Sequence, residues 1–564
     1  MMSLTAMLVS LAACLAGPET VRMSDFALTA SDNGNAIEKI GKALEYGKSL
    51  GKPFEIEFEK GEYFLDLGDP AGSEGSLRNY VFLLDGLSGV TIDGGGSEFI
   101  FKGIAGFARI VRCSNIELRN FSIDWKRPYI TQAVIRDCGS DWMDLEIDKE
   151  QYPYRIAGKK VRYICGDGEY GVEEGTYCNY FTPDGRILPG SHDNYWMEYL
   201  LKSPAEEISD GVIRFHGKVD VPAPKGTILT IYNVRYRTPW ATVVDSKDIS
   251  FKDVTVYHTT GCGIVATITE NITMDNLDYI PRREKGRVFS GVADAVHLTN
   301  CSGRIIMRNC DMDGQGDDAL NIHGRYCKVE SAGADGRTFR FSTSHGILLL
   351  KPKDKIWFLN YSDMQRSREY TVESARTINP SLFEVTLTEA PDLRGGKQWF
   401  IESASSCPDV LIENNVFGSG NRARGILLTS PGKVVVRNNV FKSAGTAILV
   451  EGDLTYWYES GGVRDLTITG NLFDNCHTSQ WGHSVISFAP SPVPDDDSLP
   501  RFHRGTRITG NTFRLIEPSV LYASFVEDLV FKDNSISVTG EFPALGNMAA
   551  PIVLEHCSNC LTEY

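Results

Sequence analysis

The sequence lacks an excess of positive charge. Its 564 residues contain 57 Lys and Arg against 73 Asp and Glu, which gives a formal net charge of −16. Proteins that bind nucleic acid usually present a basic surface, so we expect no nucleic acid among the partners. The same balance weighs against a polyanionic sugar substrate, although a local basic cleft could hide within the acidic total.

Cysteine clusters with metal-ligand spacing are also missing. Of the 13 cysteines, only Cys557 and Cys560 are spaced as a ligand pair, and a zinc site would need two further ligands nearby. We therefore predict no metal and no other cofactor. Cysteines such as Cys301 and Cys310 lie in apolar strand patterns and are expected to be buried thiols, while disulfides stay open for an exported chain.

The N-terminal apolar run, MMSLTAMLVSLAACLAG at residues 1–17, is too short to form a stable helix across a bilayer. Its length is that of a signal peptide, although no Lys or Arg precedes it. The tetrapeptide ending in Cys14 resembles a lipoprotein cleavage box, in which Cys14 would be lipidated and attach the chain to a membrane. A plain secretory signal, or a start codon placed too early, is the alternative. We expect export to a bacterial periplasm or to a lipid-anchored position.

What the sequence does contain is a short repeat. Alternating apolar residues followed by Asn recur in VLIENNVF from Val410, VVVRNNVF from Val434 and LTITGNLF from Leu466. Equivalent asparagines are separated by 24 (439 − 415) and 23 (534 − 511) residues, and by 32 (471 − 439) and 40 (511 − 471) where we expect inserted loops. Short strands with Asn at the bends predict an all-β, parallel β-helix, in which Asn tolerates the left-handed backbone and stacks into hydrogen-bonded ladders. A β-sandwich or propeller does not naturally give this period.

The repeat also predicts the organisation of the chain. An amphipathic helix at residues 35–50 resembles the N-terminal cap of pectin-lyase-like right-handed β-helices, because the apolar bore of a coil needs a cover. Two stretches lose the repeat and are expected to be small β-barrels inserted at loops. The expected segments are a signal peptide (1–17), cap and first turns (18–130), first barrel (131–240), turns with the candidate site (241–327), second barrel (328–404) and C-terminal turns (405–564).

Three acids form the strongest candidate site. Asp317 and Asp318 stand in GQGDDALNIHG, and Asp294 stands in ADAVHLTN, 23 residues upstream. A coil with that period would place the three carboxylates on neighbouring turns about 4.8 Å apart, as general acid and base catalysis on a glycosidic bond requires. We expect Gly316 to permit a bend that turns both adjacent acids toward a cleft. A solvated turn or a calcium site is the alternative.

Several other residues could bind a substrate at the same face. His297, Asn321 and His323 alternate outward on the two strands that follow the acids. Arg422 and Arg424 precede a neighbouring strand and Glu451 follows the next one, so all three could contact sugar hydroxyls if the turns align. An aromatic ring could stack on a sugar face, and Trp125 is our first choice. The other aromatic candidates are Trp240, Trp457 and Trp481. Each is equally well explained by buried packing.

This combination resembles glycoside hydrolase family 110. The similarity rests on ADAVHLTN, GQGDDALNIHG, the NFSIDWKRPYITQA stretch from Asn120 and the two β inserts, and it covers nearly the whole chain after residue 17. It implies an exo-acting α-1,3-galactosidase on a β-helix, inverting and metal-independent, acting on ends such as the blood-group B determinant. It also implies catalytic roles for Asp294, Asp317 and Asp318. We expect Asp317 to be the general acid, with Asp294 and Asp318 holding and deprotonating the water.

Other functions remain open at this stage. The acids are arranged as in polygalacturonases, but the GHG and RIK motifs of those enzymes are absent, which argues against a uronate substrate. A β-helix lyase would need calcium ligands and a basic residue as proton acceptor, and a glycan-binding β-helix without catalysis would leave the three acids unexplained. The sequence does not decide between branched and linear galactosides. A homodimer through the exposed inserts is a weak expectation.

Overall fold

The computed structural model describes residues 17–30, 34–68, 79–175, 177–192, 195–343, 350–393, 398–546 and 550–563. The expected signal peptide up to residue 16, with the candidate lipidation site Cys14, lies outside these residues. No helix in the part of the chain that the structure describes has the length and apolar character needed to span a bilayer.

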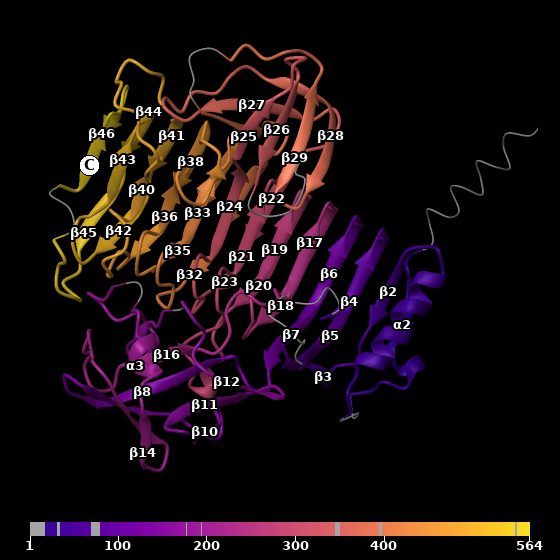
Figure 1. Ribbon diagram of the computed structural model, residues 1–564, viewed down its shortest axis with the longest axis vertical. Helices are drawn as coiled ribbons and strands as arrows, with labels where there is room; N and C mark the ends of the chain where they lie inside the picture. Colours follow the sequence, from indigo (N-terminus) through magenta and orange to yellow (C-terminus); the bar gives the residue numbers. More distant parts are fainter. Residues whose placement is uncertain are drawn as a thin grey trace, which may run out of the picture.

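The described chain winds into a parallel β-helix whose turns stack along one axis (Figure 1). Consecutive turns pair in parallel register, as where Val296 of β21 lies beside Leu320 of β24. This confirms the predicted fold class. The strands of the first face are β1 (Glu19–Arg22), β2 (Phe54–Glu57), β5 (Ser88–Gly103), β7 (Ser114–Trp125), β18 (Lys247–Val256), β20 (Glu270–Tyr279), β22 (Ser302–Arg308), β31 (Asp409–Glu413), β34 (Lys433–Arg437), β38 (Asp465–Thr469), β41 (His503–Thr509), β44 (Val526–Lys532) and β47 (Leu561–Thr562).

Two further faces complete each turn. The second continues the first beyond a bend: β3 (Glu62–Gly68), β23 (Asp311–Met312), β32 (Val416–Phe417), β35 (Val440–Phe441), β39 (Leu472–Asp474), β42 (Thr512–Leu515) and β45 (Ser535–Val538). The third is a separate sheet: β4 (Tyr80–Asp85), β6 (Gly106–Val111), β17 (Ala241–Val244), β19 (Ile264–Thr267), β21 (Val296–Thr299), β24 (Leu320–Arg325), β33 (Ile426–Thr429), β36 (Ile448–Val450), β40 (Ile486–Phe488), β43 (Leu521–Ser524) and β46 (Ile552–Glu555).

The amphipathic helix forms as predicted. Helix α2 (Ile37–Ser49) lies at the N-terminal end of the stack in Figure 1, next to the short 3-10 helix η1 (Met23–Phe26). Ile40, Ala43 and Leu44 are buried and join the core that fills the coil. The apolar bore is therefore covered at this end by an apolar helix face.

Asparagine side chains connect the C-terminal turns in a buried ladder. The rungs are Asn415, Asn439, Asn471, Asn511 and Asn534, and each side-chain amide donates to the carbonyl oxygen of the next rung at 2.9–3.0 Å. The backbone N–H of each rung donates to the same oxygen. The ladder predicted from the uneven spacing is thus confirmed, and the longer spacings are loops that leave the rungs in register.

The left-handed backbone belongs to the residue before each rung rather than to the rung itself. The φ angles there are 57° at Asn414, 56° at Asn438, 66° at Gly470, 67° at Gly510 and 56° at Asp533. The NN pairs of the repeat therefore divide two tasks, because the first residue turns the chain and the second hydrogen-bonds.

Phenylalanines two residues after the rungs stack inside the bore. The ring centroids of Phe417 and Phe441 are 4.7 Å apart, those of Phe441 and Phe473 5.1 Å, and those of Phe473 and Phe513 4.6 Å. Ladder and stack together fix the register of these turns.

Both inserts are β structures on either side of the stack in Figure 1. The second is a closed barrel: β25 (Cys327–Ala332), β26 (Thr338–Ser342), β27 (Lys355–Asn360), β28 (Tyr370–Asn379), β29 (Leu382–Leu387) and β30 (Trp399–Ser403). The first has an antiparallel six-stranded sheet of β8 (Ile130–Cys138), β9 (Trp142–Glu146), β13 (Tyr180–Phe181), β14 (Ala205–Ser209), β15 (Val212–His216) and β16 (Ile228–Tyr232), with α3 (Glu198–Leu201) and a small sheet of β10 (Tyr154–Ala157), β11 (Lys160–Cys165) and β12 (Gly168–Tyr170).

The ladder can be tested with the adjacent pair Asn414 and Asn415. Asn415→Ala removes the acceptor of the Cys310 N–H and the amide that donates to Met307 and Asn439, all in a buried site. We expect the free energy of unfolding to fall by about 2–4 kcal/mol, measured by urea denaturation. Asn414→Gly keeps the left-handed turn and should change it by less than about 1 kcal/mol. Equal losses in the two variants would contradict the division of tasks.

Candidate functional site

The three acids meet where the chain enters the third face of two neighbouring turns. Asp294 precedes β21 and the pair Asp317 and Asp318 precedes β24. The register of Val296 with Leu320 is an offset of 24 residues (320 − 296), which places Asp294 level with Asp318. The Asp318 N–H donates to Asp294 Oδ1 at 3.2 Å. One carboxylate oxygen from each of the three residues lies within 4.8 Å of the others.

The adjacent acids do not face the cavity together, contrary to our expectation. Asp294 and Asp317 line a cavity of about 240 Å³, whereas Asp318 is fully buried and does not line it. The reason is that neighbouring residues of extended chain point in opposite directions. Gly316 does not make that bend. It allows the backbone to pass close to Val292, because a Cβ at this position would lie 2.7 Å from the Val292 carbonyl oxygen.

Two arginines balance the charge of the pair. Arg424 Nε donates to Asp318 Oδ1 at 2.5 Å, and its Nη2 lies 3.6 Å from Asp317 Oδ1. Arg422 Nη2 lies 3.2 Å from Asp317 Oδ2 and 2.8 Å from the Tyr177 hydroxyl, and its Nε donates to the Gly316 carbonyl. Arg424 lines the cavity, but Arg422 is buried beneath it. The prediction that Arg422 contacts sugar is therefore wrong, because its buried guanidinium is already engaged with Asp317, the Gly316 carbonyl and the Tyr177 hydroxyl.

Burial shifts the carboxyl pKa values. It raises the pKa of Asp294, against the opposing hydrogen bond from His297. It raises the pKa of Asp318 well above the usual value, against the opposing charge of Arg424. Asp318 Oδ2 is buried without a hydrogen-bond partner among the described residues. The cluster therefore holds a proton more readily than isolated carboxylates do.

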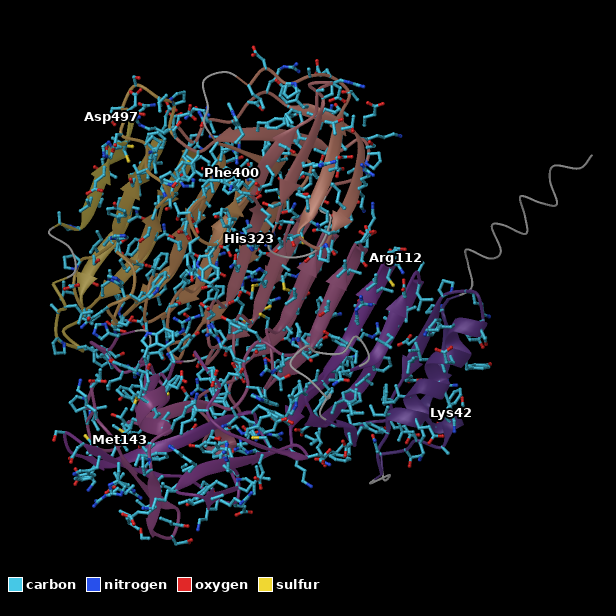
Figure 2. The ribbon with its side chains drawn as sticks, viewed as in Figure 1. Lys42, Arg112, Met143, His323, Phe400 and Asp497 are labelled. Atoms are coloured by element: carbon cyan, nitrogen blue, oxygen red, sulfur yellow. The ribbon has the colours of Figure 1, made fainter. Side chains whose placement is uncertain are left out.

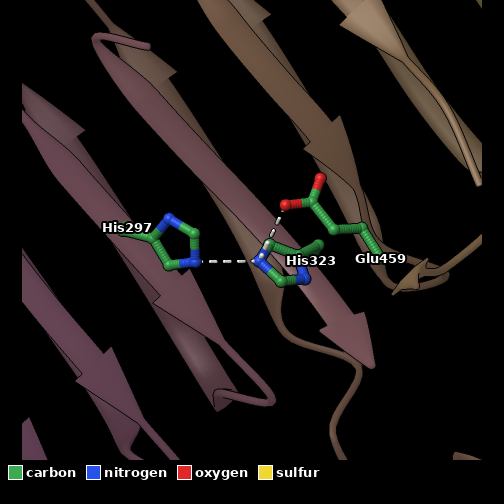
Figure 3. A group of neighbouring side chains, drawn as sticks. All are labelled: His297, His323 and Glu459. Carbon is green, nitrogen blue, oxygen red and sulfur yellow. Dashed lines mark hydrogen bonds and ion pairs between the residues drawn. The ribbon is translucent and has the colours of Figure 1, made fainter. Parts of the chain in front are cut away.

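Two histidines of the cavity lining, His297 and His323, lie side by side on neighbouring strands (Figure 3). His297 Nδ1 lies 2.6 Å from Asp294 Oδ2, and His323 Nδ1 lies 2.5 Å from the Gly324 carbonyl oxygen. Both Nδ1 atoms must donate there, so the two Nε2 atoms, 3.0 Å apart, need one proton between them. Burial opposes a charge on His297, but the Asp294 carboxylate outweighs it and raises the pKa of His297. Burial and the neighbouring charge of His297 lower the pKa of His323 well below its usual value. The geometry thus describes a His297 imidazolium that donates to neutral His323.

The same residues have the composition of a metal site. His297, His323 and Glu459 offer ligand atoms within 4.8 Å of one another, with Glu459 Oε1 3.6 Å from His323 Nε2. A cation could occupy the place of the shared proton, since metal-bound histidines also donate through Nδ1. The proton on His297 already accounts for the contact, and the two arginines account for the carboxylates. We therefore assign no metal here.

The remaining cavity wall comes from four parts of the chain. Asn321, His323 and Arg325 lie on β24, and Trp457 and Glu459 come from the loop around β37 (Glu459–Ser460). Tyr236 lies between β16 and β17, and Cys262 precedes β19. Strand β37 pairs antiparallel with the end of β24. Figure 2 shows His323 on the coil between Met143 of the first insert and Phe400 of the second. The cavity is therefore formed by the coil and the loop around β37, together with Tyr236 from the segment after β16.

Comparison with known proteins identifies relatives of this chain. The family description GLAA-B beta-barrel domain I matches residues 131–229, within the first insert. Alpha-1,3-galactosidase B of Bacteroides thetaiotaomicron is 32% identical over 98% of this chain and 92% of its own length. This chain belongs to the α-1,3-galactosidases of glycoside hydrolase family 110. Alpha-1,3-galactosidase A of Bacteroides fragilis is 28% identical over 97% of this chain and 92% of its own. The family 28 exopolygalacturonase of Yersinia enterocolitica matches at a TM-score of 0.40 with 14% identity, over 97% of this chain and 78% of its own.

The aromatic candidates of this family 110 chain divide between the core and the cavity. Trp125 is buried in the core, stacked on Phe101 at 4.6 Å with its Nε1 donating to the Gly103 carbonyl. It cannot reach a sugar, so that prediction is wrong. Trp240 is buried as well, whereas Trp457 lines the cavity and is 59% exposed. Glu451 does not line the cavity, and burial raises its pKa to about 7.

Four wall residues escaped sequence reasoning: Tyr236, Cys262, Arg325 and Glu459. Only Glu459 left a signal, since the 32-residue spacing between Asn439 and Asn471 marked the loop that carries it.

Proposed function

We propose that this family 110 chain hydrolyses terminal α-1,3-linked galactose from oligosaccharides or glycoconjugates, with inversion. The observation that carries the proposal is the carboxylate cluster at the cavity, in a chain 32% identical to an alpha-1,3-galactosidase B. Branched blood-group B ends and linear α-1,3-galactosides are both candidate substrates. We also propose export, which the apolar run at residues 1–17 motivates.

Asp294 is suited to be the general base. Both of its oxygens accept hydrogen bonds, from His297 Nδ1 and from the Asp318 N–H, and these bonds favour the carboxylate. A water in the cavity beside Asp294 would be deprotonated by that carboxylate. Asp318, buried behind the cavity, would act on this water through Asp294, whose Oδ1 accepts the Asp318 N–H.

Asp317 is then the general acid, because it is the other acid that lines the cavity. Its carboxyl group reaches the substrate side of the cavity. During cleavage Asp317 would protonate the leaving oxygen as the glycosidic bond breaks.

The contacts of the three carboxyl groups favour water, rather than an aspartate, as the nucleophile. Asp294 is hydrogen-bonded at both oxygens, Asp317 is paired with two arginines and Asp318 is buried. A single displacement by water inverts the anomeric centre. The oxygens within 4.8 Å are closer than the roughly 6.5–9.5 Å between carboxyl groups in most inverting glycosidases, so inversion does not rest on their spacing.

Proton NMR of the first product tests the function. The protein is mixed with a branched B-type oligosaccharide, and separately with linear galactose-α-1,3-galactose. We expect β-galactose to appear first, because water attacks the face opposite the leaving group. Initial α-galactose would keep the hydrolase and overturn inversion. No galactose from either substrate would overturn the proposed activity.

Substitution of the acids separates their roles. Each of Asp294→Asn, Asp317→Asn and Asp318→Asn should lower kcat by about 10²-fold or more on the disaccharide. On an aryl α-galactoside, whose leaving group needs little protonation, Asp317→Asn should recover most of that loss and Asp294→Asn should not. Asn321→Ala is the matched control for a cavity residue without a proton-transfer role. Recovery by Asp294→Asn instead would reverse the assignment of acid and base.

The acidic limb of the pH profile reports Asp294. Since burial raises its pKa, kcat/KM should begin to fall at a higher pH than for an ordinary aspartate as the solution is acidified. His297→Leu removes the hydrogen bond that lowers this pKa, so the limb should move to a still higher pH. Asn321→Ala should lower activity without moving the limb. An unmoved limb in His297→Leu would show that His297 does not act on Asp294.

A further inference from the structure

Arg325 is a buried cation without a partner. Its side chain is 7% exposed, and it forms no hydrogen bond or ion pair with any residue that the structure describes. Burial lowers the pKa of Arg325 to about 10, which still leaves it charged at neutral pH. Buried charges are costly unless they are paired, so an unpaired one at a cavity indicates a place for an anion.

The natural partner of Arg325 is turned away from it. Glu459 lies directly opposite Arg325 in the pairing of β37 with β24. Its carboxylate instead approaches His323 Nε2 at 3.6 Å and Asn321 Nδ2 at 3.5 Å. The Glu459 carboxylate, which could neutralise Arg325 across the strands, therefore contacts residues of the catalytic cavity instead.

A second cavity adjoins the catalytic one at Arg325. It measures about 280 Å³ and is lined by Arg325, Tyr326, Lys328, Ser342, Thr343 and Tyr458. Both charged residues in this lining are basic. The carboxylate paired with Lys328 is that of Glu330, 4.0 Å away on the same strand. The Thr343 hydroxyl is buried and has no hydrogen-bond partner among the described residues.

We propose that this second cavity binds an anionic substituent, a sulfate ester or a carboxylate, of the glycan whose galactose occupies the catalytic cavity. Arg325 would donate to its oxygens, Lys328 would add charge, and the Thr343 hydroxyl would complete the site. The proposal rests on the proposed galactosidase function for the identity of the glycan. The anion site itself does not depend on it.

Sulfate is the probe for the anion site. The melting temperature of the whole protein is titrated with sodium sulfate against sodium chloride at equal ionic strength. We expect saturable stabilisation, with the apparent dissociation constant weakened about tenfold or more by Arg325→Met and less by Lys328→Ala. Lys353→Ala, on the same barrel outside the cavity, should behave as the parent protein. Absence of saturation, or equal constants in all four proteins, would overturn the site.

Without sulfate, the same titration separates a ligand-binding arginine from a structural one. Arg325→Met keeps the length of the side chain and removes an unpaired charge, so its melting temperature should equal or exceed that of the parent protein. A lower melting temperature would indicate that Arg325 supports the fold, against the proposal.

Kinetics then identify the glycan. Three α-1,3-galactosyl disaccharides are compared by kcat/KM: neutral, anionic on the galactose, and anionic on the sugar that follows it, each anion as sulfate or carboxylate. At least one anionic substrate should exceed the neutral one by about fivefold, and Lys328→Ala should remove that preference while cleavage of the neutral substrate persists. Sulfate binding without such a preference would mean an adventitious ion only and would overturn the proposal. No galactose from any substrate would defeat the galactosidase function, while the sulfate titration still decides the anion site.

Discussion

The parallel hydrogen bonds between β21 and β24 are the constraint on which the candidate site depends. They set an offset of 24 residues between neighbouring turns and so bring Asp294 level with Asp318. A slip of one residue would reverse the side to which every following side chain points. The Asn ladder and the Phe stack hold the C-terminal turns in the same register. The hydrogen bonds that stabilise the coil therefore also fix the relative positions of the acids.

At the candidate site each acidic side chain has a basic side chain nearby, so charges of one sign do not cluster. The acids face Arg422 and Arg424 on one side and His297 on the other. His323 stays neutral because burial, and after it the charge of His297, lower its pKa. This arrangement keeps several ionisable groups together in a buried place, since each charge has an opposite charge or a fixed hydrogen bond nearby. Arg325 is the exception, and it marks the boundary with the second cavity.

Local sequence reasoning succeeded where the period of the coil decides position. The ladder asparagines, the capping helix and the meeting of Asp294 with the Asp317–Asp318 pair follow from spacing and strand alternation. It failed where position depends on how a loop or insert folds back. Glu459 reaches the cavity through a loop, and Trp125 carries an aromatic ring that suits a sugar or a core equally well. The composition likewise gave no sign of the second cavity's two basic residues, because a net charge of −16 does not report where individual charges lie.

The uneven spacing of the ladder has a consequence for how such a protein can diversify. Between rungs the chain runs 24, 32, 40 and 23 residues, yet the rung contacts remain at 2.9–3.0 Å. Because each turn hydrogen-bonds only to its neighbours, extra residues at a bend project outward without disturbing the scaffold. The loop with Trp457 and Glu459 is such an addition, and it supplies part of the cavity wall. Substrate selectivity can therefore change through insertions and deletions at the bends, while the acids keep their positions on an unchanged β-helix.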